Sequence, residues 1–343
     1  FIYFTMENAS KPPSNYVLYA DRIQGPWSKP FDLKMEGFSH PGHIVSPKGD
    51  RFLHFSGGMA VPLNQSGDMA MDSIKKVYAG WNYPKEWVLE CPCLESPKLL
   101  YKDKMYYLVS AMGGDGGPST SNMAIVARSS NPLGPWENSP YNPLIKTKHR
   151  DEAWWSTGHA TLIDDVEGNW WAIFQGYQNS FRSLGLQTLL LPVDWNGDGW
   201  PVISDSIFAD VKLKKPSGEN IGHGMVLSDD FMSNEMGFQW GFPTQDCKCN
   251  FMCGDGQLAV MAHGDKIHEG ALTAISPVNT SYAVSVKLEV DPDAEGGILF
   301  YGERNLYSGI GLKKGTIVMY NNGKLMDIGS VQIPKNETNA LWL

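Results

Sequence analysis

The first two hundred residues of this chain contain a strand unit that recurs, and this repeat limits the possible folds more than any other feature. Four segments rich in aromatic residues share one pattern and occupy residues 1–5, 50–56, 103–110 and 168–175. Their last residues, Thr5, Ser56, Ser110 and Gln175, lie 51, 54 and 65 positions apart. Three of the four follow a turn that contains Gly or Asp, as strands of β-hairpins often do. A repeat of this period indicates an array of similar units.

A second repeat lies between the aromatic segments. Residues 22–27 (R-I-Q-G-P-W) resemble residues 131–136 (N-P-L-G-P-W), and a predicted strand precedes each of them. Units of roughly 50 residues, with four strands and no helical periodicity, are typical of β-propeller blades. A sandwich with repetitive strands is the alternative, but its strands would not repeat a whole unit at this spacing. We therefore predict an all-β chain with a β-propeller over residues 1–210.

The pattern changes after the propeller region. A polar stretch with Pro and Gly at 212–218 predicts a linker over 211–224. Alternating strand patterns return at 282–290, 297–301, 309–313 and 316–320, with a turn at 321–323. They predict a second all-β domain over 225–343, most simply a β-sandwich. The chain opens on F-I-Y-F and ends in mid-pattern, so we expect both the first blade and the sandwich to be truncated.

The composition narrows the classes of partner. The net charge of −9 argues against nucleic acid, which is bound by clustered Lys and Arg. No run of residues approaches the ~20 apolar positions of a membrane span. Twelve Trp and fourteen Tyr fit a neutral carbohydrate, because flat rings stack on the apolar faces of sugars, although core filling is the commoner role of such rings. We expect a carbohydrate substrate, no nucleic acid and no membrane span.

The five cysteines and the glycosylation sequons bear on the compartment. Cys91 and Cys93 flank a proline, and Cys247, Cys249 and Cys253 form a second cluster. Buried thiols with one disulfide are the expected state, since a zinc site would need a fourth ligand that the sequence does not identify. The four N-x-S/T sites at Asn8, Asn64, Asn279 and Asn336 permit secretion.

Glu95 is the acidic residue best placed for chemistry. It lies in C-L-E-S-P-K-L-L (93–100), directly before the third aromatic segment, where the inner strand of a blade would begin. This stretch resembles the E-G-P-K-L motif of glycoside hydrolase family 43, five-bladed propellers that act on arabinose-, xylose- and sometimes galactose-containing polysaccharides. The resemblance implies that Glu95 is the general acid of an inverting glycosidase. Ser96 stands where the family usually has glycine.

Further motifs extend the resemblance over nearly the whole chain. G-H-A-T-L (158–162) resembles the family's G-H-G-D/A stretch, which implies that His159 faces the central channel and binds a calcium ion or its waters. Residues 185–195 with 198–201 resemble the family's fifth-blade motif, and residues 229–240 resemble the start of the sandwich domain that often follows. The resemblance implies a five-bladed β-propeller followed by a concanavalin-like β-sandwich. It implies no required cofactor, with a structural calcium ion in the channel as an option.

Three positions depart from the family pattern. The family's catalytic base, an aspartate, would lie upstream of Phe1. His40 in S-H-P-G-H-I (39–44) stands where the family has an aspartate that tunes the acid. A carboxylate would raise the pKa of Glu95, whereas a protonated imidazole would lower it. His40 is therefore either a neutral partner or a proton carrier in catalysis, or it only packs under the pocket. Leu186 replaces a common arginine, and Arg182 is a nearby substitute.

Several residues around the expected pocket are candidates for substrate binding. The glycine-rich stretch 111–117, with Met112, follows the third aromatic segment at the expected rim and does not resemble a phosphate-binding loop. Trp154 and Trp155 precede His159 and are candidate sugar-stacking rings or core residues. Asp151 and Glu152 sit in a predicted loop, where a solvated surface is the expected setting.

The predicted function is hydrolysis of O-glycosidic bonds in plant-type polysaccharides or oligosaccharides. An arabinofuranosidase or xylosidase is the first expectation and a galactosidase the second. One alternative is a carbohydrate-binding propeller that has lost catalysis, and another is a sugar hydrolase in which His40 or His43 is the acid. The family resemblance implies a secreted, periplasmic or cell-surface location.

Overall fold

The computed structural model describes all residues except 9, 205–212, 220–223, 244–249, 329–339 and 343. The chain divides into two compact units, Phe1–Asn220 and Ile221–Leu343, and each is described by itself. The division falls within the predicted linker 211–224. Residues 211–212 and 220–223 of that linker lie outside the described residues, and 213–219 contain no strand or helix. The bounds of the linker therefore stay a prediction.

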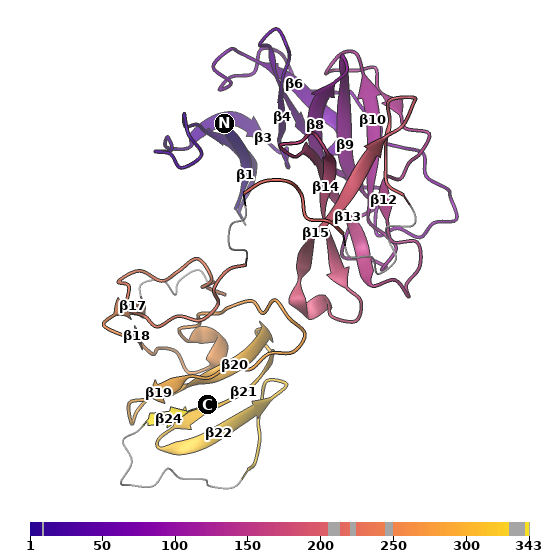
Figure 1. Cartoon of the computed structure of the whole chain (residues 1–343). Helices are drawn as coiled ribbons and strands as arrows, with labels where there is room; N and C mark the ends of the chain where they lie inside the picture. Colours follow the sequence, from indigo (N-terminus) through magenta and orange to yellow (C-terminus); the bar gives the residue numbers. More distant parts are fainter. Residues whose placement is uncertain (9, 205–212, 220–223, 244–249, 329–339, 343) are drawn as a thin grey trace. The chain divides into compact units, whose positions relative to one another are not determined.

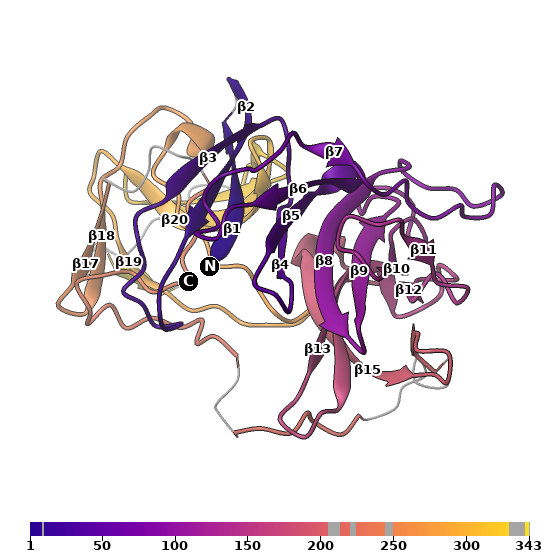
Figure 2. The same ribbon diagram turned by 90° about the horizontal axis from the view of Figure 1, so that it is seen from above.

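The described residues of the first unit form four antiparallel sheets, each built from strands that follow one another in the chain (Figure 1). The first sheet contains β1 (Ile2–Asn8), β2 (Lys11–Leu18) and β3 (Phe31–Glu36), and the second β4 (Gly42–Val45), β5 (Arg51–Phe55), β6 (Met59–Leu63) and β7 (Lys75–Lys76). The third contains β8 (Leu94–Lys102), β9 (Met105–Met112), β10 (Met123–Ser129), β11 (Glu137–Asn138) and β12 (Ile145–Lys146). The fourth contains β13 (Trp154–Asp164), β14 (Trp170–Gln178), β15 (Leu186–Trp195) and β16 (Pro201–Val202). Seen from above, the sheets follow one another along a curve (Figure 2).

The repeated aromatic segments form equivalent strands, as predicted. They correspond to β1, β5, β9 and β14. The strands predicted before residues 22–27 and 131–136 correspond to β2 and β10. Strand β9 shows why the segments are rich in apolar residues. Tyr107 and Val109 pack in one cluster with residues of β13 to β15, whereas Leu108 and Met112 pack in another with Tyr78. A blade has neighbours on both faces, so both sets of alternating side chains are buried.

Strands β4 and β13 each lie beside β8, and each of the three strands has a residue with a left-handed backbone in it or just before it. The φ angles are +53° at His40, just before β4, +46° at Ser96 in β8 and +53° at His159 in β13. β-bulges interrupt the pairing of β8 and β13 at these points. A Cβ atom on Gly42 would overlap the Pro97 carbonyl oxygen of β8. The close approach of β4 to β8 therefore requires glycine at this position.

The second unit is also built from strands. They are β17 (Phe251–Gly254), β18 (Gln257–Val260), β19 (Lys287–Glu289), β20 (Glu295–Glu303), β21 (Leu306–Lys313), β22 (Thr316–Asn321), β23 (Lys324–Leu325) and β24 (Ala340–Trp342). Strands β20 to β23 form one antiparallel sheet, in which Asn322 and Gly323 make the tight turn between β22 and β23 with φ of +50° and +72°. The strand predicted over 282–290 is shorter in the structure, because only Lys287–Glu289 finds a partner strand, β24.

Helix is almost absent from the described residues, which confirms the all-β prediction. It is limited there to three 3-10 turns, η1 (Ser56–Gly58), η2 (Arg182–Leu184) and η5 (Ile267–Glu269). None of the helices in the described part of the chain has the length and apolar character needed to cross a membrane.

Candidate active site

Glu95 lies at the start of β8, where the chain enters the blade. Its backbone pairs with Ala111 of β9, and the β-bulge that follows runs from Glu95 to Lys98. The bulge re-aims the side chain relative to a regular strand. The carboxyl group is half-buried, with 32% of the side chain exposed. A carboxyl group in this setting is open to substrate and partly shielded from water.

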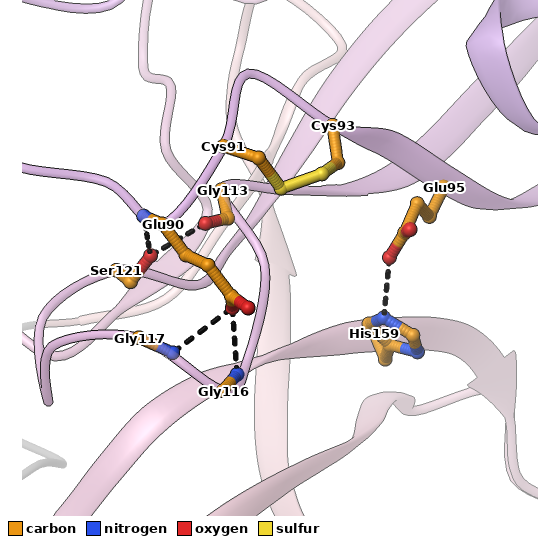
Figure 3. Close-up of a disulfide and its surroundings, with 9 residues drawn as sticks. All are labelled: Glu90, Cys91, Cys93, Glu95, Gly113, Gly116, Gly117, Ser121 and His159. Carbon is orange, nitrogen blue, oxygen red and sulfur yellow. Dashed lines mark hydrogen bonds and ion pairs between the residues drawn. A yellow bond between two sulfur atoms is a disulfide. The ribbon is translucent and has the colours of Figure 1, made fainter.

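Two histidines from neighbouring blades stand near this carboxyl group. The Nε2 atom of His159 lies 3.7 Å from Oε2 of Glu95 (Figure 3). The His40 ring stands edge-on to the His159 ring, with 6.4 Å between centroids. His40 Nδ1 is 2.7 Å from the Ser56 hydroxyl oxygen. The structure thus brings together Glu95, His40 and His159, three residues that the sequence singled out, and it adds Ser56, which the sequence did not.

The surroundings favour the ionised form of Glu95. The pKa of its carboxyl is lowered chiefly by the neighbouring His159 imidazole and further by the charge of His40, while partial burial acts in the opposite direction. Positive charge near a carboxyl stabilises the carboxylate, whereas removal from water destabilises it. In this structure the imidazoles have the larger effect. The downward direction of this pKa shift agrees with the expectation for a histidine in place of the family's aspartate.

A pocket of about 320 Å³ opens beside Glu95. Its walls are formed by Ser56, Gly57, Lys76, Ala79, Pro92, Cys93, Leu94 and Glu95. The volume lies at the lower end of the range that holds small organic ligands. The pocket therefore places a sugar-sized space against a half-buried carboxyl group. Lys76 was not singled out from sequence, because a lone polar residue in a short outer segment carries no periodic signal, and Ser56 was named only as the end of an aromatic segment.

The glycine-rich segment 113–117 is held from both sides by charged side chains. The backbone N–H groups of Gly116 and Gly117 donate to Oε2 of Glu90 at 2.7 and 2.9 Å (Figure 3). The Arg182 guanidinium donates to the carbonyl oxygens of the same two residues at 3.2 and 2.7 Å. A Cβ atom on Gly117 would lie 2.5 Å from Cβ of Glu90, so the approach depends on glycine. Within the described residues Arg182 thus holds this loop and makes no ion pair with Glu95.

The cysteines next to this loop form a disulfide between Cys91 and Cys93 (Figure 3). The bridge lies between Glu90, which holds the loop, and Glu95. Cys253 has a free, half-buried thiol. Cys247 and Cys249 lie outside the described residues.

The remaining predicted residues have different settings. Met112 is buried among Tyr78, Leu108 and Met123, with only 6% of its surface exposed, because it belongs to the core-facing set of β9 side chains. The structure does not bring it to the pocket wall. Trp154 and Trp155 are half-buried at the start of β13, and the Trp155 indole N–H donates to the Arg150 carbonyl at 2.8 Å.

Other polar residues near these strands lie apart from the group around Glu95. His43 packs on the Tyr3 ring, with 4.6 Å between centroids, and burial lowers its pKa to about 4. The Asp151 side chain is 90% exposed. Glu152 accepts backbone N–H groups of Lys148 and His149 at the surface. Of the two histidines considered as alternative acids, only His40 lies beside Glu95.

The side chains around His159 decide whether a calcium ion fits there. In the described part of the chain, no group of three or more His, Cys, Asp or Glu side chains could hold a metal ion. The neighbours of His159 are Glu95 and the edge of the His40 ring. These residues do not make a calcium site on their own.

Comparisons with known proteins agree on one family. The sequence model of glycosyl hydrolases family 43 matches residues 1–201. The chain is 29% identical over 239 residues to a non-reducing end alpha-L-arabinofuranosidase of Bacteroides ovatus, covering 66% of this chain and 42% of that protein. It is 29% identical over 231 residues to a xylan 1,3-beta-xylosidase of a Vibrio species, covering 59% and 41%. The chain therefore spans less than half the length of these relatives.

Solved structures show the same architecture. A family 43 protein from Bacillus licheniformis superposes with a TM-score of 0.82 at 24% identity, over 99% of this chain and 69% of the other. A xylan beta-1,4-xylosidase from Bacillus halodurans superposes with a TM-score of 0.78 at 20% identity, over 99% and 70%. This likeness confirms the predicted fold class, a five-bladed β-propeller followed by a β-sandwich. The four sheets of the first unit are four of its blades.

Proposed function

Since this chain belongs to glycosyl hydrolase family 43, we propose that its protein hydrolyses O-glycosidic bonds with Glu95 as the general acid. The observation that carries the proposal is the position of Glu95, a half-buried carboxyl on the wall of a sugar-sized pocket with His159 at 3.7 Å. Hydrolysis of a glycoside needs a proton on the leaving oxygen, and a carboxyl group in such a setting supplies it. His159 and His40 orient the acid in this proposal.

The proposed substrates are pentosides of plant-type polysaccharides or oligosaccharides. The names of the relatives, an arabinofuranosidase and xylosidases, support arabinofuranosides and xylosides as the first choice. Galactosides are the second choice. A panel of 4-nitrophenyl glycosides of these three sugars would rank them, and turnover of none of them would contradict the proposed class.

The lowered pKa of free Glu95 sets a requirement for the mechanism. The acid must hold its proton when the glycosidic bond breaks. A bound sugar fills the pocket and removes water from the carboxyl group, and this desolvation raises the pKa of Glu95 toward its working range. We propose inversion, in which a water molecule attacks from the opposite face with help from a second carboxyl group about 6.5–9.5 Å away. No residue of this chain is assigned to that base.

The test compares two leaving groups in the protein with Glu95→Gln. An aryl glycoside with a poor leaving group, such as phenol, needs the proton and should lose roughly 10²–10⁴-fold in kcat. A 2,4-dinitrophenyl glycoside leaves without a proton and should lose far less. Equal losses on both substrates would contradict the role of acid.

Two further measurements complete the test. Glu137→Gln is the matched control, because this β11 carboxyl pairs with Arg128 and has 61% of its side chain exposed. It should leave both rates unchanged. Proton NMR of the first product formed gives the anomeric outcome, and retention would contradict inversion.

A carbohydrate-binding propeller without catalysis is the second candidate. Two observations favour it, the histidine at position 40 and the lowered pKa of Glu95. Isothermal titration with xylo- and arabino-oligosaccharides separates the two proposals. Binding without release of sugar on prolonged incubation would support the binding protein over the enzyme.

We also propose that the protein works outside the cytoplasm. The Cys91–Cys93 disulfide supports this location, because such bonds persist in oxidising compartments. Fractionation of the source cells, followed by detection of the protein, tests it. Recovery with the cytoplasmic fraction alone would contradict it.

A further inference from the structure

Lys76 places a positive charge on the wall of the pocket that Glu95 also lines. It belongs to the short strand β7, whose two residues, Lys75 and Lys76, pair with β6. Successive side chains of a strand point to opposite faces. The structure shows this alternation, because Lys75 binds Asp72 at 2.6 Å while Lys76 lines the pocket.

The position of Lys76 is not explained by an acidic partner in the part of the chain that the structure describes. No carboxylate of the described residues lies within ion-pair distance of its ammonium group, whereas Lys75 has Asp72 and Glu95 has His159. The groups that act on the Glu95 carboxyl are His159, His40 and burial, and Lys76 is not one of them. The ammonium group is thus available to meet a ligand and does not neutralise the acid.

Apart from Lys76 and Glu95, the pocket wall offers few strong polar groups. The other lining residues are Ser56, Gly57, Ala79, Pro92, Cys93 and Leu94. A neutral sugar would gain little from an ammonium group, but an acidic sugar gains a charge-assisted hydrogen bond. The chain carries a net charge of −9 and the Glu95 carboxyl group lines the same wall, so an acidic ligand meets a repulsion that the Lys76 ammonium group can offset.

We infer that this pocket receives a sugar unit that carries an acidic group, with Lys76 as its specificity-determining residue. The inference rests on the proposed glycosidase function, because the acid of a glycosidase lies between the two sugar units that flank the scissile bond. One of those two units is the acidic sugar, and Glu95 protonates the glycosidic oxygen that links the acidic sugar to the other unit. A uronic acid and a sulfated sugar share the required chemistry.

The test measures ligand binding and needs no turnover. The whole protein with Glu95→Gln is titrated, by ligand-observed NMR, with D-glucuronate, D-glucose 6-sulfate and D-glucose, which differ only in the group at C6. At least one of the anions should bind roughly fivefold more tightly than glucose, and the difference should shrink at high salt. The two anions distinguish a carboxylate from a sulfate ligand.

Lys76→Met on the same background should abolish the preference for the anion, while the neighbouring Lys75→Met serves as the matched control and should keep it. The control Lys75→Met should also bind glucose as the parent does. The inference is overturned if neither anion binds better than glucose, or if the preference survives Lys76→Met. Loss of hydrolysis in Glu95→Gln is read in a separate assay, so a failure of the glycosidase proposal is distinguishable from a failure of this one.

Discussion

At the scale of single residues, the state of the Glu95 proton is the central question. A family 43 acid is expected to have an aspartate neighbour, and here two imidazoles take that place. His159 lies 3.7 Å from the carboxyl group, and the His40 ring is beyond it. The pKa of Glu95 is lowered, so less of the free protein carries a proton on the proposed acid at a given pH. The upper pH limit of activity should therefore lie low for an enzyme of this kind.

Exchange of either histidine should move the alkaline limb of the kcat/KM profile. The limb falls where the free acid loses its proton, so a higher pKa of Glu95 moves it to higher pH. His159→Gln and His40→Asn remove the imidazoles that lower the pKa of Glu95 and should shift the limb upward. His40→Asp adds a negative charge and should shift it further than His40→Asn.

Profiles measured from pH 3 to 8 on one aryl glycoside test this order, because the limb of the unmodified protein is expected below the ordinary pKa of a glutamate. His43→Gln is the matched control, because His43 packs on Tyr3 away from Glu95. The alkaline limb of the His43→Gln profile should coincide with that of the unmodified protein. A downward shift for His40→Asp would show that Glu95 is not the group that titrates.

At the scale of elements, the loop 113–117 illustrates how a glycine-rich segment is fixed in place. Glu90 accepts two backbone N–H groups of the loop, and Arg182 donates to two carbonyl groups of the same residues. In an exposed loop, the backbone N–H and C=O groups otherwise form short-lived hydrogen bonds with water molecules. Here opposite charges take up both kinds of group, which orders the loop without strand pairing.

Glu90→Ala should loosen this loop without unfolding the blade. The amides of Gly116 and Gly117 should exchange their hydrogens roughly tenfold faster, and the free energy of unfolding should fall by about 1 kcal/mol. Hydrogen–deuterium exchange with mass spectrometry of the segment 113–121 measures the first effect. The exposed Glu86→Ala is the control, and equal exchange in the two variants would show that Glu90 does not hold the loop.

The blades could be predicted from the sequence, but the loops between them could not. The alternation of aromatic residues and the spacings between the segments can be read directly from the sequence. They correctly located β1, β5, β9 and β14. The strand over 282–290 was overpredicted, because alternation alone does not supply the partner that only Lys287–Glu289 finds. The loop contacts of Glu90 and the place of Lys76 on the pocket wall depend on which segments meet in space, and no spacing in the chain encodes that.

At the scale of the whole molecule, the circular order of the blades explains why part of the site was predictable. Residues 40, 95 and 159 each lie in or just before the first strand of a blade, and these inner strands meet at the centre of a propeller. Glu95, His40 and His159 could therefore be grouped from the order of the blades in the sequence. Met112 ends β9 and its side chain belongs to the buried face of the strand, so its predicted contact with substrate stays a prediction.

The packing between blades also contains a buried histidine that ties stability to pH. His54 of β5 is 1% exposed, and burial lowers its pKa from 6.5 to about 4, opposed by a hydrogen bond to the Pro132 backbone. Between pH 6.5 and 4 the unfolded chain binds a proton at this histidine and the folded protein does not. The free energy of unfolding should therefore fall as pH decreases through this window, by about 3 kcal/mol from His54.

Urea unfolding followed by tryptophan fluorescence at pH 7.5, 6, 5 and 4.5 measures this dependence, since most tryptophans lie in residues 1–220. His54→Gln should be less stable at pH 7.5 but should have a shallower decline toward low pH, because glutamine takes up no proton. The remaining decline in stability comes largely from His43. Its lowered pKa also makes the free energy of unfolding fall toward low pH, but by less than His54 does, because His43 is partly exposed. Asp and Glu residues with lowered pKa values act mainly below pH 4.5, outside the measured range. Parallel declines for the two proteins would mean that His54 is already protonated in the folded blade, and that the contact between the second and third sheets tolerates a buried charge.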